Sequence, residues 1–152
     1  MCDTRLPDEH HFARQCTGFG GKNFSDEQDG YREPPWLEAS AFQPSPKNPH
    51  VSGLWVERVD GAWRDQLDRV RAELKGSGRN IRKTYQLAIV QVEGIKSLGR
   101  QHGRELHVLH TPDEEANLPS HSEIRGIAPE DHALQQRIAD SAQIEPIVPD
   151  EN

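Results

Sequence analysis

The apolar residues of this chain are concentrated after residue 50, and this uneven distribution limits what the chain can fold into. Of its 31 Leu, Ile, Val and Phe residues, 25 follow position 50 and only six precede it. A segment with so few apolar side chains cannot bury a core of its own. We therefore expect an irregular Pro- and Gly-rich arm over residues 1–49, an α/β core over residues 50–143 and a loose tail over residues 144–152. The expected anchors of the arm on the core are Phe12, Phe19, Phe24 and Phe42.

The core segment opens with one strand pattern and one helix pattern. Residues 51–59 predict a strand whose odd-numbered and even-numbered residues face opposite sides. Apolar residues then recur at helical spacing from Trp63 to Leu74, which predicts an amphipathic helix over about residues 61–75. On its polar face, Arg69 and Glu73 form an i,i+4 pair worth roughly a few tenths of a kcal/mol.

The remaining core segments predict further strands and a last helix. Residues 84–92 are apolar on both faces, as in a central strand, and residues 104–110 read as another strand. The short helix between them suggests a right-handed crossover with the two strands parallel, although its shortness leaves a hairpin-like alternative open. Residues 120–127 predict a short edge strand, and residues 130–142 predict a surface helix that follows Pro129.

Taken together, these patterns predict one domain of the α+β or mixed α/β class. It would hold a small three- to four-stranded sheet, two main helices and the irregular N-terminal arm. Within the arm, Leu6-Pro7-Asp8-Glu9 indicates a turn, and His10 to Cys16 would form the body of a short helix.

The charge distribution disfavours nucleic acid as the main partner. The net charge is −7 and no basic block stands out, whereas phosphate recognition needs clustered Lys and Arg. A local patch from Arg79, Arg82 and Lys83 is the nearest candidate, although such a cluster is more often a solvated loop. No apolar run approaches the roughly 20 residues that span a bilayer. With two cysteines and no recognisable signal peptide, we expect a cytoplasmic protein.

Four residues near the N-terminus invite comparison with a zinc site: Cys2, His10, His11 and Cys16. All four are residue types that bind zinc. Their spacing lacks the close Cys or His pairs of a structural zinc site, so the better interpretation is polar histidines and a small buried cysteine. We expect no metal and no cofactor.

A second group consists of histidines near predicted strand ends. If residues 85–92 and 104–110 are parallel strands, Glu93 and His110 both emerge at their carboxyl ends, where open α/β sheets bind ligands. His107 and His121 lie nearby in the sequence. A histidine beside a carboxylate can act as a general base, but a hydrogen-bonded histidine at a strand end is the commoner outcome.

Three short segments carry a resemblance. Residues 6–16 read LPDEHHFARQC, residues 51–57 read VSGLWVE and residues 119–124 read PSHSEI. They resemble the Leu-Pro-Asp-x-x-His-x-x-Arg, Ser-x-x-Trp-x-Glu and Asn-Pro-Ser-His segments of a group of short, uncharacterised bacterial proteins, with one residue inserted in the last. The resemblance implies no activity. It implies that a shared site would draw on His11, Arg14, Ser52, Trp55, Glu57 and His121.

These observations support three hypotheses about function. The first is a non-catalytic bacterial interaction or accessory protein with a protein partner, because the chain is acidic and loop-rich, has aromatic residues such as Trp36 and lacks nucleotide-binding and hydrolase motifs. The second is a small hydrolase or nuclease that uses His11 or His121 with Arg14 and Glu57. The third is a zinc-binding module. If the six residues of the resemblance are not a site, they would pin the N-terminal arm to the sheet through buried hydrogen bonds.

Overall fold

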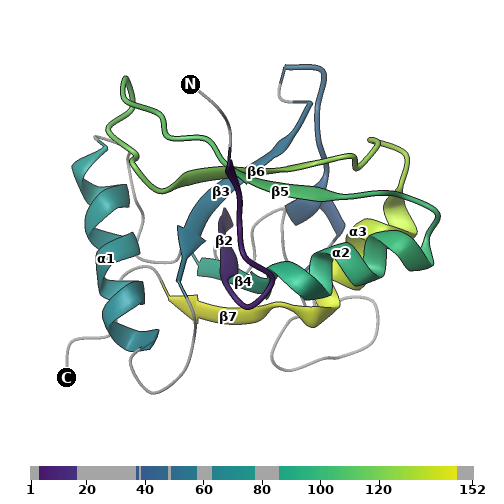
Figure 1. The fold of residues 1–152 in the computed structure, drawn as a ribbon, viewed down its shortest axis with the longest axis horizontal. Helices are drawn as coiled ribbons and strands as arrows, with labels where there is room; N and C mark the ends of the chain where they lie inside the picture. The colour runs from purple at the N-terminus through teal and green to yellow at the C-terminus, as the bar shows by residue number, and fades with distance from the viewer. Residues whose placement is uncertain are drawn as a thin grey trace, which may run out of the picture.

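A single antiparallel sheet organises the described part of the chain (Figure 1). The computed structural model describes residues 4–16, 37, 39–47, 49–57, 63–77 and 86–146. Within them the strand order is β1-β5-β6-β3-β2-β4-β7, and every neighbouring pair is antiparallel. The strands are β1 (Thr4–Arg5), β2 (His11–Cys16), β3 (Val51–Val56), β4 (Gln86–Gln91), β5 (His107–His110), β6 (His121–Arg125) and β7 (Gln143–Pro146).

In the part of the chain that the structure describes, three helices cover the two faces of this sheet. The helices are α1 (Trp63–Gly76), α2 (Val92–Gln101) and α3 (His132–Ser141), with a 3₁₀ turn, η2 (Ala39–Phe42). In Figure 1, α2 and α3 lie side by side, whereas α1 stands apart from them. Two cores result, because side chains of α2, α3 and η2 pack on one face of the sheet and those of α1 pack on the other.

The predicted α+β class agrees with this fold, but the predicted size and topology of the sheet are wrong. Counted over the described residues, the sheet has seven strands rather than three or four. The expected parallel crossover is also wrong, because β6, β3 and β2 lie between β5 and β4 in the sheet. Helix α2 therefore leads the chain from one side of the sheet to the other. Residues 120–127 were expected at an edge, yet β6 lies inside the sheet between β5 and β3.

The largest correction concerns the N-terminal segment. Residues 11–16, expected in a short helix of an irregular arm, form β2 in the interior of the sheet between β3 and β4. Phe12 lies opposite Trp55 of β3 and opposite Val90 of β4. Its side chain is fully buried with that of Cys16 on one face, while Ala13 is buried on the other. Pairing with two remote strands outweighs the local helical pattern, as is common for strands.

The C-terminal end of the described chain also belongs to the sheet. Residues 143–146 form β7, which pairs with four residues of β4, although most of this stretch was expected in a loose tail. Between β2 and β7, β4 is buried on both faces, which confirms the central position predicted for it.

The alternation predicted for β3 is confirmed. Val51 packs on the side of α2 and α3, whereas Leu54 and Val56 pack on the side of α1. Gly53 cannot be replaced by a larger residue, because a Cβ there would lie 2.4 Å from Phe12 Cζ and 2.6 Å from the Ala13 carbonyl oxygen. This close approach lets the Phe12 ring lie across β3.

Some expectations fall on residues whose structure is not described. Of the four expected phenylalanine anchors, Phe12 and Phe42 are buried in the core beside α3. Helix α3 buries a broader face than its narrow sequence stripe predicted, since Gln135 and Ala139 are buried as well as Leu134 and Ile138. The expectations outside the described residues concern Cys2, Phe19, Phe24, Trp36, Arg79, Arg82 and Lys83.

Candidate binding cleft

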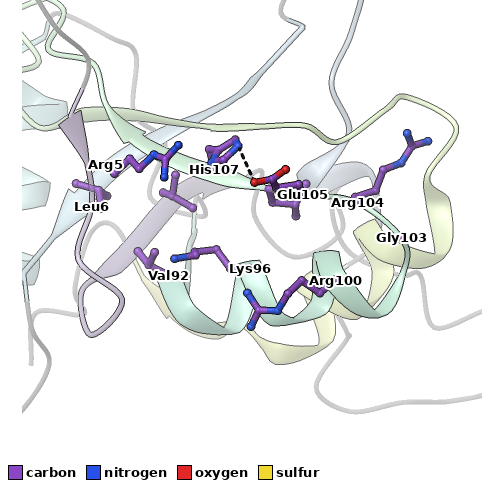
Figure 2. Close-up of a pocket in the computed structure, with 11 residues that line it drawn as sticks. Arg5, Leu6, Val92, Lys96, Arg100, Gly103, Arg104, Glu105 and His107 are labelled. Carbon is purple, nitrogen blue, oxygen red and sulfur yellow. Dashed lines mark ion pairs between the residues drawn. The ribbon is translucent and has the colours of Figure 1, made fainter.

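A cleft of about 560 Å³ separates α2 from β1 and β5 (Figure 2). We call it the basic cleft. Its apolar floor is supplied by buried side chains of the N-terminal segment, α2 and β5. The residues around it are Arg5, Leu6, Val92, Lys96, Arg100, Gly103, Arg104, Glu105, Leu106, His107 and Val108.

The walls of the basic cleft follow from helix and strand periodicity. Val92, Lys96 and Arg100 are four residues apart, so they lie along one face of α2. The opposite wall carries Arg5 and His107, and Figure 2 shows their side chains across the gap from Lys96. The segment between β1 and β2 is held against β5, because the Leu6 N–H donates to the Val108 carbonyl oxygen at 2.9 Å.

Helix α2 can approach the floor closely because it carries a glycine. A Cβ at Gly99 would lie 2.5 Å from Leu106 Cγ. The helix does not end at this glycine, because α2 continues to Gln101. Gly99 therefore serves the packing of the helix on Leu106 rather than its termination.

Two cations of the basic cleft form ion pairs that an incoming anion could replace. Lys96 Nζ lies 2.7 Å from Asp8 Oδ1, and Arg100 Nη2 lies 3.2 Å from Glu93 Oε1. The hydrogen bond from Lys96 holds the pKa of Asp8 below its ordinary value. All four side chains are at least one-third exposed, and exposed ion pairs contribute little to stability. An incoming anion can therefore compete for Lys96 and Arg100.

The other two arginines of the cleft differ from each other. Arg104 holds Asp131 with two contacts of 2.9 Å, one from Nε and one from Nη2. Burial raises the pKa of Asp131, but the hydrogen bonds from Arg104 and the Ala128 N–H lower it overall. Arg104 is thus held by an ion pair at the start of α3, and Figure 2 shows its side chain turned away from the cleft. Arg5 is exposed and has no acidic partner among the described residues.

The four residues expected to form a catalytic site are divided between different places. His11 and Arg14 are three residues apart on β2, so their side chains leave opposite faces of the sheet. The pairing register puts the backbones of His11 and His121 two strands apart and two residues out of line, about 12 Å. Glu57 is exposed just beyond the end of β3.

Two of these expected residues are held by backbone carbonyl oxygens. Arg14 donates from Nε to the Ala41 carbonyl at 2.7 Å and from Nη1 to the Ser52 carbonyl at 2.5 Å. His121 Nδ1 lies 2.9 Å from the carbonyl oxygen of Thr111. Arg14, Ser52 and His121 also line a second, smaller pocket, whereas His11 and Glu57 do not.

Trp55 joins two histidines in an aromatic group. Its Nε1–H donates to His10 Nδ1 at 2.8 Å, and the two rings stack with centroids 5.6 Å apart. The ring centroid of His110 lies 5.0 Å from that of Trp55, with the two rings tilted. His110 Nε2 also hydrogen-bonds to the Pro119 carbonyl oxygen. Glu93, expected beside His110, instead pairs with Arg100, because β4 and β5 are not neighbours in the sheet.

The described residues bring together no group of three or more His, Cys, Asp or Glu side chains that would hold a metal ion. Of the weak zinc candidates, Cys2 lies outside these residues, and Cys16 is a free, buried thiol. Burial raises the pKa of Cys16 to about 11, so this thiol stays protonated at neutral pH. No helix in the described ranges is both long enough and apolar enough to cross a bilayer.

Comparison with known proteins adds no relative to these observations. The chain matches no protein-family model, no curated protein and no solved structure. The sequence resemblance to short bacterial proteins therefore stays a prediction.

The basic cleft was missed by sequence reasoning because its residues are scattered. Arg5, Lys96 and His107 come from three separate elements, and none of them belongs to a cluster of basic residues in the sequence. The one available signal was the i,i+4 spacing of Val92, Lys96 and Arg100, which places two cations and an apolar side chain on one helix face.

Proposed function

We propose that this chain is a non-catalytic interaction protein that works with a protein partner, and that its basic cleft receives an acidic segment of that partner. The observation that supports the proposal is the combination of an apolar floor with Arg5, Lys96 and Arg100 around it. A segment that alternates acidic and apolar side chains would satisfy both parts of this surface. A cleft of about 560 Å³ has room for a few side chains, which favours a short segment over a folded surface.

The overall charge of −7 does not oppose such an interaction at close range. At physiological ionic strength, charges more than about 8 Å apart are largely screened, so the local cations decide what the cleft attracts. We keep the bacterial cytoplasm as the proposed location, and the free thiol of Cys16 is compatible with a reducing compartment.

The proposal is tested with a defined peptide and a charge reversal. The probe is a fluorescein-labelled dodecapeptide of alternating Glu and Leu, and its affinity is measured by fluorescence anisotropy at 50 and 500 mM NaCl. Arg5→Glu should weaken binding by about tenfold, because one favourable charge contact becomes a repulsive one. Arg137→Glu, the same charge change at an exposed position of α3 outside the cleft, should leave the affinity unchanged.

A second variant should change the affinity in the opposite direction. Asp8→Asn removes the carboxylate that competes for Lys96, so the acidic peptide should bind several-fold more tightly. A peptide with Lys in place of each Glu serves as the charge control. Equal binding of the lysine peptide, or equal effects of Arg5→Glu and Arg137→Glu, would contradict the proposal.

A further inference from the structure

The hydrogen-bond donors of the basic cleft stand on two facing walls. Lys96 and Arg100 lie one helical turn apart on α2. On the other wall, Arg5 pairs with Leu109 in the ladder between β1 and β5, so Arg5 and His107 are diagonal neighbours roughly 7–8 Å apart. Figure 2 shows the Arg5 guanidinium directed toward His107, with the head groups of Lys96 and Arg100 across the gap. A ligand between the walls therefore meets donors from both sides.

These donors are open to solvent, so a ligand can reach them. The exposed fraction of the side chain is 34 % for Lys96, 59 % for Arg100 and 33 % for His107. Arg5 is exposed as well. Each of the four side chains can donate hydrogen bonds, and the arginines and the lysine are positively charged at neutral pH. The accessible chemistry of the two walls therefore suits a group that is anionic and rich in acceptors.

The carboxylates that already contact α2 indicate which anion would gain most. Asp8 Oδ1 lies 2.7 Å from Lys96 Nζ, and Glu93 Oε1 lies 3.2 Å from Arg100 Nη2. A glutamate that displaced Asp8 would replace one carboxylate with another, so the exchange at Lys96 itself gains little. A phosphoryl group carries about 1.5 to 2 negative charges at neutral pH and three acceptor oxygens. It can therefore contact Lys96 and a cation of the opposite wall together.

Arg5 is the cation that is open to such a group on the opposite wall. No acidic side chain pairs with it among the described residues. Glu105 is the one acidic residue that lines the cleft, and its side chain is 88 % exposed. Glu105 Oε1 lies 3.9 Å from His107 Nε2, which is beyond hydrogen-bonding distance. A guanidinium can donate two parallel N–H groups to phosphate oxygens, so Arg5 is suited to a bidentate contact.

We propose that the basic cleft recognises a phosphorylated side chain of its acidic partner segment and holds the phosphoryl group between Arg5 and Lys96. This inference rests on the proposed function, because it names the group of the partner that the cleft selects. Arg5 binds two phosphoryl oxygens, Lys96 exchanges Asp8 for the third oxygen, and His107 adds an N–H donor on the side of Arg5.

The test compares three peptides with the intact protein at pH 7.5, where a phosphomonoester with a second pKa of about 6 is mostly a dianion. They are the fluorescein-labelled Glu-Leu dodecapeptide and two versions in which one central Glu is replaced by phosphoserine or by serine. Fluorescence anisotropy should show that the phosphoserine peptide binds at least about tenfold more tightly than the all-glutamate peptide, and the serine peptide more weakly than both. Equal affinities of the phosphoserine and glutamate peptides would overturn the phosphoryl preference but leave the proposed function intact. Failure of all three peptides to bind would contradict both.

A competition experiment distinguishes a phosphorylated segment from free phosphate. Inorganic phosphate should displace the labelled phosphoserine peptide only at concentrations at least about a hundredfold above the dissociation constant of the peptide, because it lacks the contacts of the flanking residues. Displacement at concentrations close to that dissociation constant would mean that the cleft binds free phosphate, and it would overturn the proposal of a phosphorylated partner.

A substitution then tests the contact with Arg5. In Arg5→Gln, the ratio of the affinities for the phosphoserine and glutamate peptides should fall several-fold, because the dianion loses more than a single carboxylate does. Arg137→Gln, the same change at an exposed position of α3, should keep the ratio of the unaltered protein. Arg5 is itself exposed, so its replacement leaves the core intact. A ratio that is unchanged in Arg5→Gln would overturn the placement of the phosphoryl group between Arg5 and Lys96.

Discussion

His11 shows how one buried polar atom makes the fold sensitive to pH. Its ring is half-buried on β2, and its Nδ1 atom has no hydrogen-bond partner among the described residues. Burial lowers the pKa of His11 below its ordinary value of 6.5, and the neighbouring His10 lowers it further. The folded state therefore holds His11 neutral, whereas the unfolded chain takes up a proton at higher pH.

The resulting prediction concerns stability at mildly acidic pH. Both states leave His11 neutral well above pH 6.5, and the unfolded state alone binds the proton between pH 6.5 and the lower pKa of the folded state. The contribution of His11 to the free energy of unfolding is therefore fully present above pH 6.5 and is lost as the pH falls through that window. Urea denaturation at pH 7.5, 6.0 and 5.0 measures the free energy of unfolding. In His11→Leu this free energy should fall less steeply with decreasing pH than in the unaltered protein. The exposed control, His132→Asn, should keep the original slope.

At the scale of elements, Arg69 and Glu73 tie α1 to the sheet. The sequence predicted an ordinary helix-surface pair, and the pair is present at 2.7 Å. Arg69 Nη2 also donates to the Trp55 carbonyl at 2.7 Å, and Glu73 accepts hydrogen bonds from the Ser120 N–H and hydroxyl. The Trp55 N–H in turn donates to the Ser120 carbonyl. The pair therefore joins α1 to β3 and to the segment that enters β6.

Removing this junction should cost more than removing a surface ion pair. Glu73→Ala removes the acceptor for Ser120 and Arg69, so it should lower the free energy of unfolding by about 1–3 kcal/mol. Asp68→Ala on the same helix removes an exposed partner of Arg71 and should cost less than about 0.5 kcal/mol. Both values come from urea denaturation at pH 7.5. Similar small losses for the two variants would mean that the junction does not stabilise α1.

Helices were easier to predict from the sequence than strand partners. The stripe of α1 that ends at Leu67, Val70 and Leu74 is a local pattern, and all three side chains are buried as expected. Strand β2 was misjudged because its stability comes from β3 and β4, which are remote in the sequence. The basic cleft was missed for the same reason, since Arg5 and Lys96 line the same cleft only after β1 pairs with β5.

At the scale of the whole molecule, the antiparallel sheet depends on pairings between distant parts of the chain. Strand β2 pairs with β4, and β4 pairs with β7 near the C-terminal end of the described chain. The sequence could not reveal this order, because alternation shows which faces of a strand are buried but not which strand lies beside it. Folds with such non-local pairings close long loops before they gain contacts, so we expect folding to be slow for a chain of this length.

Deletion of β7 tests how far the sheet depends on its edge strand. A chain that ends at Ala142 loses four residue pairs with β4 and the partly buried Ile144. We expect the free energy of unfolding to fall by at least about 2 kcal/mol, because ladder hydrogen bonds and apolar burial are both lost. A chain that ends at Pro146 keeps β7 and provides the matched control. Equal stability of the two truncated chains would contradict the role assigned to β7.

An NMR map of the surface that binds an acidic segment would show directly whether the basic cleft receives it. The ¹⁵N-labelled protein is titrated with the unlabelled Glu-Leu dodecapeptide, and amide shifts are followed along the chain. The largest shifts should fall on α2 and on residues 104–108, around the basic cleft. These shifts should shrink in Arg5→Glu and persist in Arg137→Glu. Shifts confined to α1 or β7, or no shifts at millimolar peptide, would contradict the claim that the basic cleft is the binding surface.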